Sequence, residues 1–431
     1  MLIQLLEHQS FPRVQLSPQM ALVLQEFDEH HARKHDGETI FDWKYHREIK
    51  AKNWVGVIQI AELTIEILPK ISDVNDKEVH DTWRRNLLFM LWYSGSLPFS
   101  LRDIASLTYD RLPILELFIA LFSEAALTEL RNGVDRSYIH IEEESSFIKG
   151  KLIIAQQMRA GPLRQHRFCV AYDNFVSDTW INRIIKYTCQ YLNKHTNVIS
   201  TQQKLREINF VLNDVKDVSI KEHDFRNVLF NRANSRYKAL IEFCNLIISG
   251  FNPNLASGPD GGFSLLFPME TVFESFIATY IKRNARSLGF KPQWVQCQFR
   301  GRNRHLLMQL HNSGTELPRV PIRPDVVIQD DLGNPLLILD TKWKKLALDH
   351  ENYKNNVSMS DIYQVYSYAH HFDCPNNILL YPARDNVSNK KYLLSSDREK
   401  CLYTRQVDLD FDLMNKPDRL YDAISTAIGY T

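Results

Sequence analysis

Two aspartates and a lysine are spaced in a way that could build a metal-dependent hydrolytic site. Asp325 is followed by fourteen residues and then by the tripeptide Asp340-Thr341-Lys342. Successive side chains of a strand point to opposite faces, so in a strand Asp340 and Lys342 share one face and Thr341 points to the other. The spacing therefore predicts a carboxylate and an ammonium group that face the same space, as in metal-dependent nucleases.

Hydrolysis of a phosphodiester requires neutralised charge on the phosphate, an activated water and a stabilised leaving oxygen. A hard divalent cation held by carboxylates can supply all three. Mg²⁺ prefers oxygen ligands and keeps several waters, so two or three carboxylates suffice. We expect Asp325 and Asp340 to bind Mg²⁺, and Lys342 to orient or activate the attacking water and offset the charge of the transition state.

A strand hairpin is predicted to carry these residues. The apolar runs 326–328 and 336–339 contain β-branched residues and flank the turn-forming segment 329–335. Alone, an Asp-x-Lys tripeptide also occurs by chance, so its meaning depends on the neighbouring elements.

Two predicted helices flank the hairpin. Residues 267–280 carry Glu270 and Glu274 four residues apart, hence on one helix face. We expect Glu274 to be a third acidic ligand, with Glu270 competing for that role, although either could lie on a solvated surface. The downstream helical segment 361–369 carries Gln364, a candidate hydrogen-bonding partner of substrate or water, unless it serves ordinary helix packing.

Taken in this order, the segments resemble the McrC family, the nuclease subunits of McrBC modification-dependent restriction systems. The resemblance covers most of the chain. Besides the hairpin it is carried by the following motifs: Met269-x-x-x-Phe273-Glu274-x-Phe276, Gln364-x-x-x-Tyr368, IEILPKI at 65–71, FIKGKL at 147–152, YDNF at 172–175 and WINRII at 180–185.

The resemblance implies a PD-(D/E)xK endonuclease that cuts double-stranded DNA. It also implies a complex with McrB, a GTP-hydrolysing AAA+ partner that recognises methylated DNA and binds the GTP itself. The motifs carry the roles of the family over to Asp325, Asp340 and Lys342, and to Glu274 in competition with Glu270. The chain is longer than compact members of the family around residues 199–265.

The fold class implied is α/β (α+β) with three domains. Residues 1–145 are expected to form a mixed strand and helix domain that docks the partner, 146–265 a helical linking region, and 266–431 the nuclease domain. The elements predicted outside the nuclease domain are a helix capped by Ser17, a hairpin over 54–68, and helices over 79–93, 113–130, 178–193, 201–212 and 228–248.

Composition indicates a soluble globular protein whose overall charge does not attract DNA. The chain has 44% hydrophobic and 24% charged residues and a net charge of +1, so DNA affinity must come from a local basic patch or from the partner. Candidate basic residues bracket the hairpin: Arg300, Arg302, Arg304, His305, Lys342, Lys344 and Lys345.

Further patterns indicate the cellular location of the chain and limit the chemistry that it can perform. The six cysteines have no paired spacing and predict buried thiols rather than a zinc site. The sequence has no signal-like start and no apolar segment long enough to span a bilayer, so we expect a cytoplasmic protein without membrane contact. It also contains no G-x-x-x-x-G-K-[ST] run, so nucleotide hydrolysis requires another subunit.

Two alternatives stay open on the sequence alone. The chain could be an adaptor that stimulates the partner NTPase without cutting DNA. It could also be a PD-(D/E)xK nuclease of another DNA transaction, such as transposition or repair.

Overall fold

The computed structural model describes residues 1–44, 47–60, 62–71, 77–97, 112–159, 166–252, 262–298, 305–310, 316–344, 357–383 and 389–429. The chain divides into two compact units, one formed by residues 1–97 together with 253–431 and the other by residues 98–252. This division differs from the predicted boundaries after residues 145 and 265. Strand β11 (Gly262–Pro268) pairs antiparallel with β5 (Trp54–Ile60), and this long-range pairing, which the sequence pattern does not reveal, draws the two ends of the chain into one unit.

The first sheet of that unit contains the predicted hairpin of β5 and β6 (Leu63–Leu68). Its strands run in the order β1-β6-β5-β11, and β1 (Leu2–Leu6) lies parallel to β6. Helix α1 (Pro18–Lys34) covers one face of the sheet, and the Ser17 hydroxyl caps it as predicted by accepting from Met20 N at 3.2 Å. The 3-10 helix η1 and a small sheet complete this region: η1 (Arg13–Gln15), β2 (Ser10–Pro12), β4 (Glu48–Ala51) and β3 (Phe41–Asp42).

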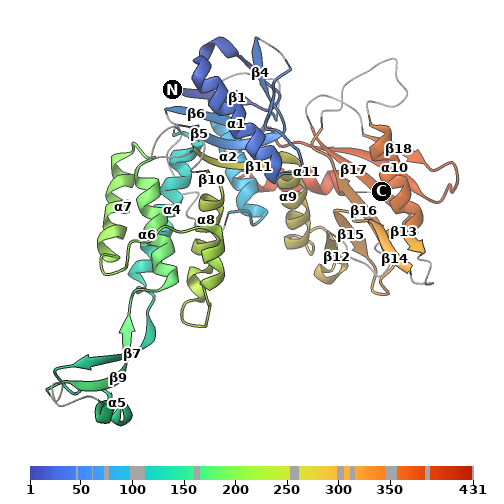
Figure 1. Ribbon diagram of the computed structural model, residues 1–431. Helices are drawn as coiled ribbons and strands as arrows, with labels where there is room; N and C mark the ends of the chain where they lie inside the picture. Colours follow the sequence, from blue (N-terminus) through green and yellow to red (C-terminus); the bar gives the residue numbers. More distant parts are fainter. Residues whose placement is uncertain are drawn as a thin grey trace. The chain divides into compact units, whose positions relative to one another are not determined.

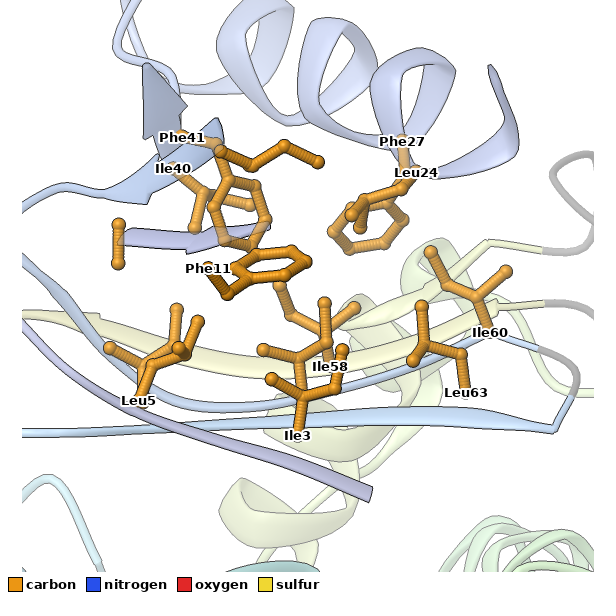
Figure 2. Close-up of a cluster of buried hydrophobic side chains, with 14 of the residues drawn as sticks. Ile3, Leu5, Phe11, Leu24, Phe27, Ile40, Phe41, Ile58, Ile60 and Leu63 are labelled. Atoms are coloured by element: carbon orange, nitrogen blue, oxygen red, sulfur yellow. The ribbon is translucent and has the colours of Figure 1, made fainter. Parts of the chain in front are cut away.

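Apolar side chains fill the space between α1 and the first sheet. Figure 2 shows Leu24 and Phe27 of the helix facing Ile58 and Ile60 of the sheet, with Phe11 beside them. All five side chains are almost completely buried. Burial of this area supplies the main favourable term for docking α1.

The second sheet of the same unit carries the predicted hairpin at 326–339 (Figure 1). Its order is β12-β15-β16-β17-β19-β18, with β16, β17 and β19 parallel and the other neighbours antiparallel. Its strands are β12 (Val295–Cys297), β15 (Val326–Gln329), β16 (Pro335–Thr341), β17 (Asn376–Pro382), β19 (Cys401–Val407) and β18 (Lys390–Leu393).

The two predicted helices that flank the hairpin are both formed. Helix α9 (Met269–Arg283) precedes it, and α10 (Met359–His371), capped by Ser358, lies between β16 and β17 in the chain. Both pack on this sheet, α9 against β12 and β16 and α10 against β16 and β17. The remaining elements of the unit are α2 (Lys77–Tyr93), η5 (Pro292–Trp294), the strand pair β13 (His305–Leu310) and β14 (Glu316–Pro321), and α11 (Pro417–Ile428).

The second unit contains the helices predicted in the middle of the chain, with one correction. Its elements outside the arm described below are α4 (Ile114–Arg131), α6 (Trp180–Asn193), α7 (Ile199–Val211), η3 (Glu222–Asn227), η4 (Ser235–Tyr237), α8 (Lys238–Ser249) and β10 (Phe251–Asn252). The predicted helix over 228–248 is wrong in its first half. There the Asn231 side chain accepts from the backbone N–H groups of Ala233 and Asn234, a local turn that competes with helix formation.

The expectation of a mostly helical middle also missed a three-stranded antiparallel sheet, which we call the arm. It comprises β7 (Ser137–Ser145), β8 (Lys151–Leu152), α5 (Ile154–Arg159) and β9 (Phe168–Val176). Figure 1 shows the arm extending away from the helices of its own unit. Strand β7 is exposed along most of its length, so it lacks the alternation of buried and exposed residues by which strands are recognised.

Two features of the described residues concern membrane-spanning helices and the cysteines. In this part of the chain no helix is both long and apolar enough to cross a membrane. All six cysteines are free thiols, and five of them are buried as predicted.

Asn86 on α2 is a buried link between the two ends of the chain. Its Nδ2 donates to Leu409 O at 3.2 Å and Phe411 O at 2.7 Å, while its Oδ1 accepts from Leu413 N at 3.0 Å. Replacement by alanine leaves three buried backbone groups without these partners. We expect Asn86→Ala to lower the free energy of unfolding by about 2 kcal/mol or more in urea denaturation. The exposed Asn415→Ala is the control, and equal stability of the two variants would contradict the assignment.

Candidate active site

The end of β16 brings Asp340 and Lys342 together. Asp340 is 1% exposed, and its Oδ2 lies 2.6 Å from the Nζ of Lys342. The two side chains face the same space, as strand alternation predicts. The backbone N–H of Lys342 donates to Leu380 O on the neighbouring strand at 2.9 Å, which fixes the chain where the strand ends.

Asp325 lies just before β15 and is tied to the same strand end. Its Oδ2 accepts from the backbone N–H of Thr341 at 2.7 Å and from the Thr341 hydroxyl at 2.8 Å. The hairpin register, with Val326 opposite Leu339, brings the residue that precedes one strand beside the residues that end the other. Asp325 and Asp340 are therefore neighbours despite fourteen intervening residues.

Of the two competing acids on α9, the structure directs Glu274 and not Glu270 toward the aspartates. Burial is the main reason that the pKa of Glu274 is raised, and the nearby charge of Asp340 raises it further, while a hydrogen bond with Asp325 acts in the opposite direction. The Glu274 Oε1 also accepts from Gln298 Nε2 at 3.4 Å. Glu270 is exposed.

Gln364 on α10 approaches the cluster from the other side of the strand end. Its Nε2 donates to Tyr368 Oη at 2.6 Å and lies 3.5 Å from Asp340 Oδ1. Tyr368 in turn donates to the carbonyl of Arg323 at 3.2 Å. The predicted pair of residues one helical turn apart thus connects the acid on β16 with the segment that leads to Asp325.

Asp361 is a further acid near the site to which the sequence reasoning gave no role. It is buried and accepts from Lys344 Nζ at 3.0 Å and from Tyr381 Oη at 3.3 Å. Its charge contributes to the raised pKa of Asp340. Its position three residues before Gln364 and seven before Tyr368 places it on the same helix face, and this periodicity is the signal that could have identified it.

The site concentrates negative charge in a buried place. Burial and the charge of Asp325 raise the pKa of Asp340 to about 7, with Lys342 opposing the shift. Burial and the charge of Glu274 raise the pKa of Asp325 to about 6, although the two hydrogen bonds from Thr341 favour its ionised form. Part of the cost of burying these carboxylates therefore remains uncompensated.

Hard cations fit the chemistry of this donor set better than soft ones. The available groups are carboxylate oxygens, which suit Mg²⁺, and Mg²⁺ needs few protein ligands because it keeps its waters. Within the described residues, however, no three Asp, Glu, His or Cys side chains are arranged as a ready metal site. The ammonium of Lys342 is the cation beside Asp340 in this arrangement.

The basic residues expected to bracket the hairpin are only partly described. Lys342 and Lys344 pair with Asp340 and Asp361. Of the other predicted basic residues, His305 begins β13, whereas the following lie outside the described residues: Arg300, Arg302, Arg304 and Lys345.

Comparisons with known proteins point to restriction systems. The family model described as McrBC 5-methylcytosine restriction system component matches residues 49–382. The type IV methyl-directed restriction enzyme EcoKMcrBC of Escherichia coli (strain K12) is 21% identical over 327 residues, which cover 72% of this chain and 89% of that protein.

Two solved structures from Thermococcus gammatolerans share the fold. A chain in a half-complex of McrB AAA+ hexamers with bound McrC aligns with a TM-score of 0.75 at 19% identity, covering 98% of this chain and 100% of that chain. A chain of an McrBC complex solved by cryo-EM aligns with a TM-score of 0.56 at 22% identity, covering 66% of this chain and 88% of that chain.

The raised pKa values of Asp325 and Asp340 predict how stability depends on pH. Both lie above the ordinary value of 3.8, so the folded chain holds more protons than the unfolded chain between about pH 4 and pH 7 and loses stability as the pH rises through that window. Asp325→Asn keeps an acceptor for Thr341 and removes one charge. Without divalent metal, we expect it to melt about 2 °C or more above the wild type at about pH 8 and no higher at about pH 4.

The control for this experiment is Glu270→Gln, which removes an exposed charge from the nearby helix. A melting difference between Asp325→Asn and wild type that is the same at both pH values would show that the charge of Asp325 carries no such penalty.

Proposed function

Because the chain belongs to the family of McrBC 5-methylcytosine restriction system components, we propose that it is the DNA-cleaving, McrC-type subunit of such a system. The observation that carries this proposal is the cluster of Asp325, Asp340 and Lys342 at the end of β16, in which Asp340 is almost completely buried. The sequence has no phosphate-binding G-x-x-x-x-G-K-[ST] loop, which argues against the GTP-hydrolysing subunit.

The order of elements around the cluster supports a PD-(D/E)xK nuclease core. A helix with an inward acid, α9, precedes an antiparallel hairpin, and a second helix, α10, leads to a strand parallel to β16. Asp325 precedes the first hairpin strand, and the Asp-x-Lys tripeptide lies at the end of the second. Each position of the motif is occupied by the residue type that the chemistry requires.

In this proposal Asp325, Asp340 and Glu274 are the residues that would hold Mg²⁺. A bound Mg²⁺ neutralises charge on the scissile phosphate and lowers the pKa of the attacking water. Lys342 would orient that water and stabilise the charge of the transition state. Gln364 donates a hydrogen bond to the substrate or the water from the side of α10. The substrate is double-stranded DNA with modified cytosine.

The partner in this proposal is a McrB-like AAA+ GTPase, which binds the GTP and supplies targeting within the cytoplasm. The structural neighbour with the greater coverage comes from an assembly of McrB hexamers with bound McrC. Residues 1–145 were predicted to dock the partner. The surface best suited to docking begins only at the end of that range, on the arm.

The arm exposes apolar side chains that its own unit does not cover. Phe147 is 78% exposed, and Ile148 and Met158 are also largely exposed. Tyr138 and Phe175, opposite each other on β7 and β9, are in ring contact with centroids 4.7 Å apart and are exposed as well. An exposed group of aromatic and aliphatic side chains is typical of a surface that binds another protein.

The proposed activity is tested by cleavage of methylated and unmethylated plasmid with the purified chain, a McrB-like partner, GTP and Mg²⁺, each omitted in turn. We expect Asp340→Ala to slow cutting at least about 100-fold because it removes a metal ligand and the partner of Lys342. Binding to the partner should persist, and Glu270→Gln should cut like the wild type.

The other outcomes of the cleavage experiment favour a different function of the chain or a structural role for Asp340. Cutting without the partner points to a nuclease of another DNA transaction. Stimulated GTP hydrolysis without any cutting favours the adaptor alternative. Loss of folding in Asp340→Ala makes Asp340 a structural residue.

The docking surface is tested by the double substitution Phe147→Ser with Ile148→Ser. We expect it to weaken binding to the partner and its GTPase stimulation at least about tenfold, because two apolar anchors are lost. The matched control is Phe210→Ser, at a phenylalanine 83% exposed on α7 of the same unit. Equal effects of the double substitution and of Phe210→Ser would show that the arm is not part of the interface.

A further inference from the structure

The side chain of Glu7 joins the first sheet to the segment after β16 that carries Lys342. Glu7 follows β1 and is 0% exposed. Its Oε2 accepts from the backbone N–H of Lys70 at 3.1 Å and from the indole Nε1 of Trp343 at 2.8 Å. Lys70 follows β6, which is parallel to β1, so both strands deliver their ends to one edge of the sheet. The IEILPKI motif at 65–71, to which the sequence assigned no role, supplies the Lys70 donor.

Trp343 connects this edge with two residues of the candidate site. It is 4% exposed and follows Lys342 directly. Its ring packs on Phe273, with centroids 5.2 Å apart, and Phe273 precedes Glu274 on α9. Trp343 therefore follows Lys342 in the chain and packs against Phe273, the residue before Glu274 on α9.

We propose that Glu7 is a positioning residue that holds Trp343, and through it Lys342 and Glu274, in the arrangement needed for DNA cleavage. The inference rests on the proposed nuclease function. An indole has a single N–H donor, so an acceptor in a fixed place sets the orientation of the ring. Glu7 is itself fixed, because its backbone N–H donates to Leu68 O at 2.9 Å.

The consequence is that the N-terminal sheet is part of the catalytic apparatus without touching substrate. Active sites lose about 100-fold in rate when a reacting group is misplaced by about 1 Å. We therefore expect loss of the Glu7 acceptor to lower the cleavage rate in a chain that still folds.

A spectroscopic experiment tests the contact without any activity. The chain has seven tryptophans, and the Trp343→Phe variant identifies the indole N–H resonance of Trp343 in ¹⁵N-tryptophan-labelled protein. We expect Glu7→Gln to shift that resonance. The matched control is Glu66→Gln, which makes the same change at a buried acid of the same sheet that pairs with Arg84 and should leave the resonance in place.

Cleavage assays with partner, GTP and Mg²⁺ test the positioning role. We expect Glu7→Ala to lower kcat by about tenfold or more, and Glu7→Gln, which keeps an acceptor, to lose clearly less. Because Glu7 acts through Trp343, the double variant Glu7→Ala with Trp343→Phe should be no slower than the slower single variant. Partner GTP hydrolysis should stay at the wild-type level in all of them.

The results that overturn the inference are distinct from those that overturn the nuclease proposal. An unshifted Trp343 resonance in Glu7→Gln, or a folded Glu7→Ala chain that cuts at the wild-type rate, rules out positioning by Glu7. Additive losses in the double variant assign Glu7 a general structural role instead. A wild-type chain that cuts no DNA under any condition refutes the nuclease proposal and the catalytic part of this inference, and the resonance still decides whether the contact exists.

Discussion

The burial of like charges at the end of β16 is the constraint on which the second sheet and its helices depend. Asp340 is almost completely buried and Asp325 is partly buried, and burial together with the charge of a neighbouring acid raises the pKa of each. Lys342 and the two donors of Thr341 offset part of these shifts. A fold can tolerate such a cluster only where a rigid frame holds it, and here a mixed sheet with helices packed on it provides that frame.

This constraint explains why the site is assembled from several elements rather than from one loop. Each element contributes groups whose direction is set by its own packing: α9 brings Glu274, the hairpin brings the two aspartates, and α10 brings Gln364. If any two of these elements exchanged places, their polar groups would no longer meet at the end of β16. The residual electrostatic cost is a form of preorganisation, because the same repulsion that lowers stability favours the binding of a cation.

Local features were predictable from the sequence and long-range ones were not. Turn residues between two β-branched runs specified the hairpin, and helix periodicity placed Gln364 and Tyr368 together. The choice between Glu270 and Glu274 required the position of α9 against the sheet, which periodicity alone cannot supply. Asp361 was overlooked because its partners come from outside α10, Lys344 from the segment after β16 and Tyr381 from β17. The arm was missed because an exposed strand has no buried face to give it a pattern.

The pairing of β5 with β11 has a consequence for how the chain is made. Residues 1–97 leave the ribosome long before Gly262 to Pro268, yet the first sheet needs these later residues to complete its order. Contacts between distant parts of a sequence slow folding, and an unpaired strand edge is prone to pair with other chains. Residues 98–252 are all synthesised after β5 and before its neighbour β11. One edge of β5 thus stays without its β11 partner until translation is well past the middle of the chain.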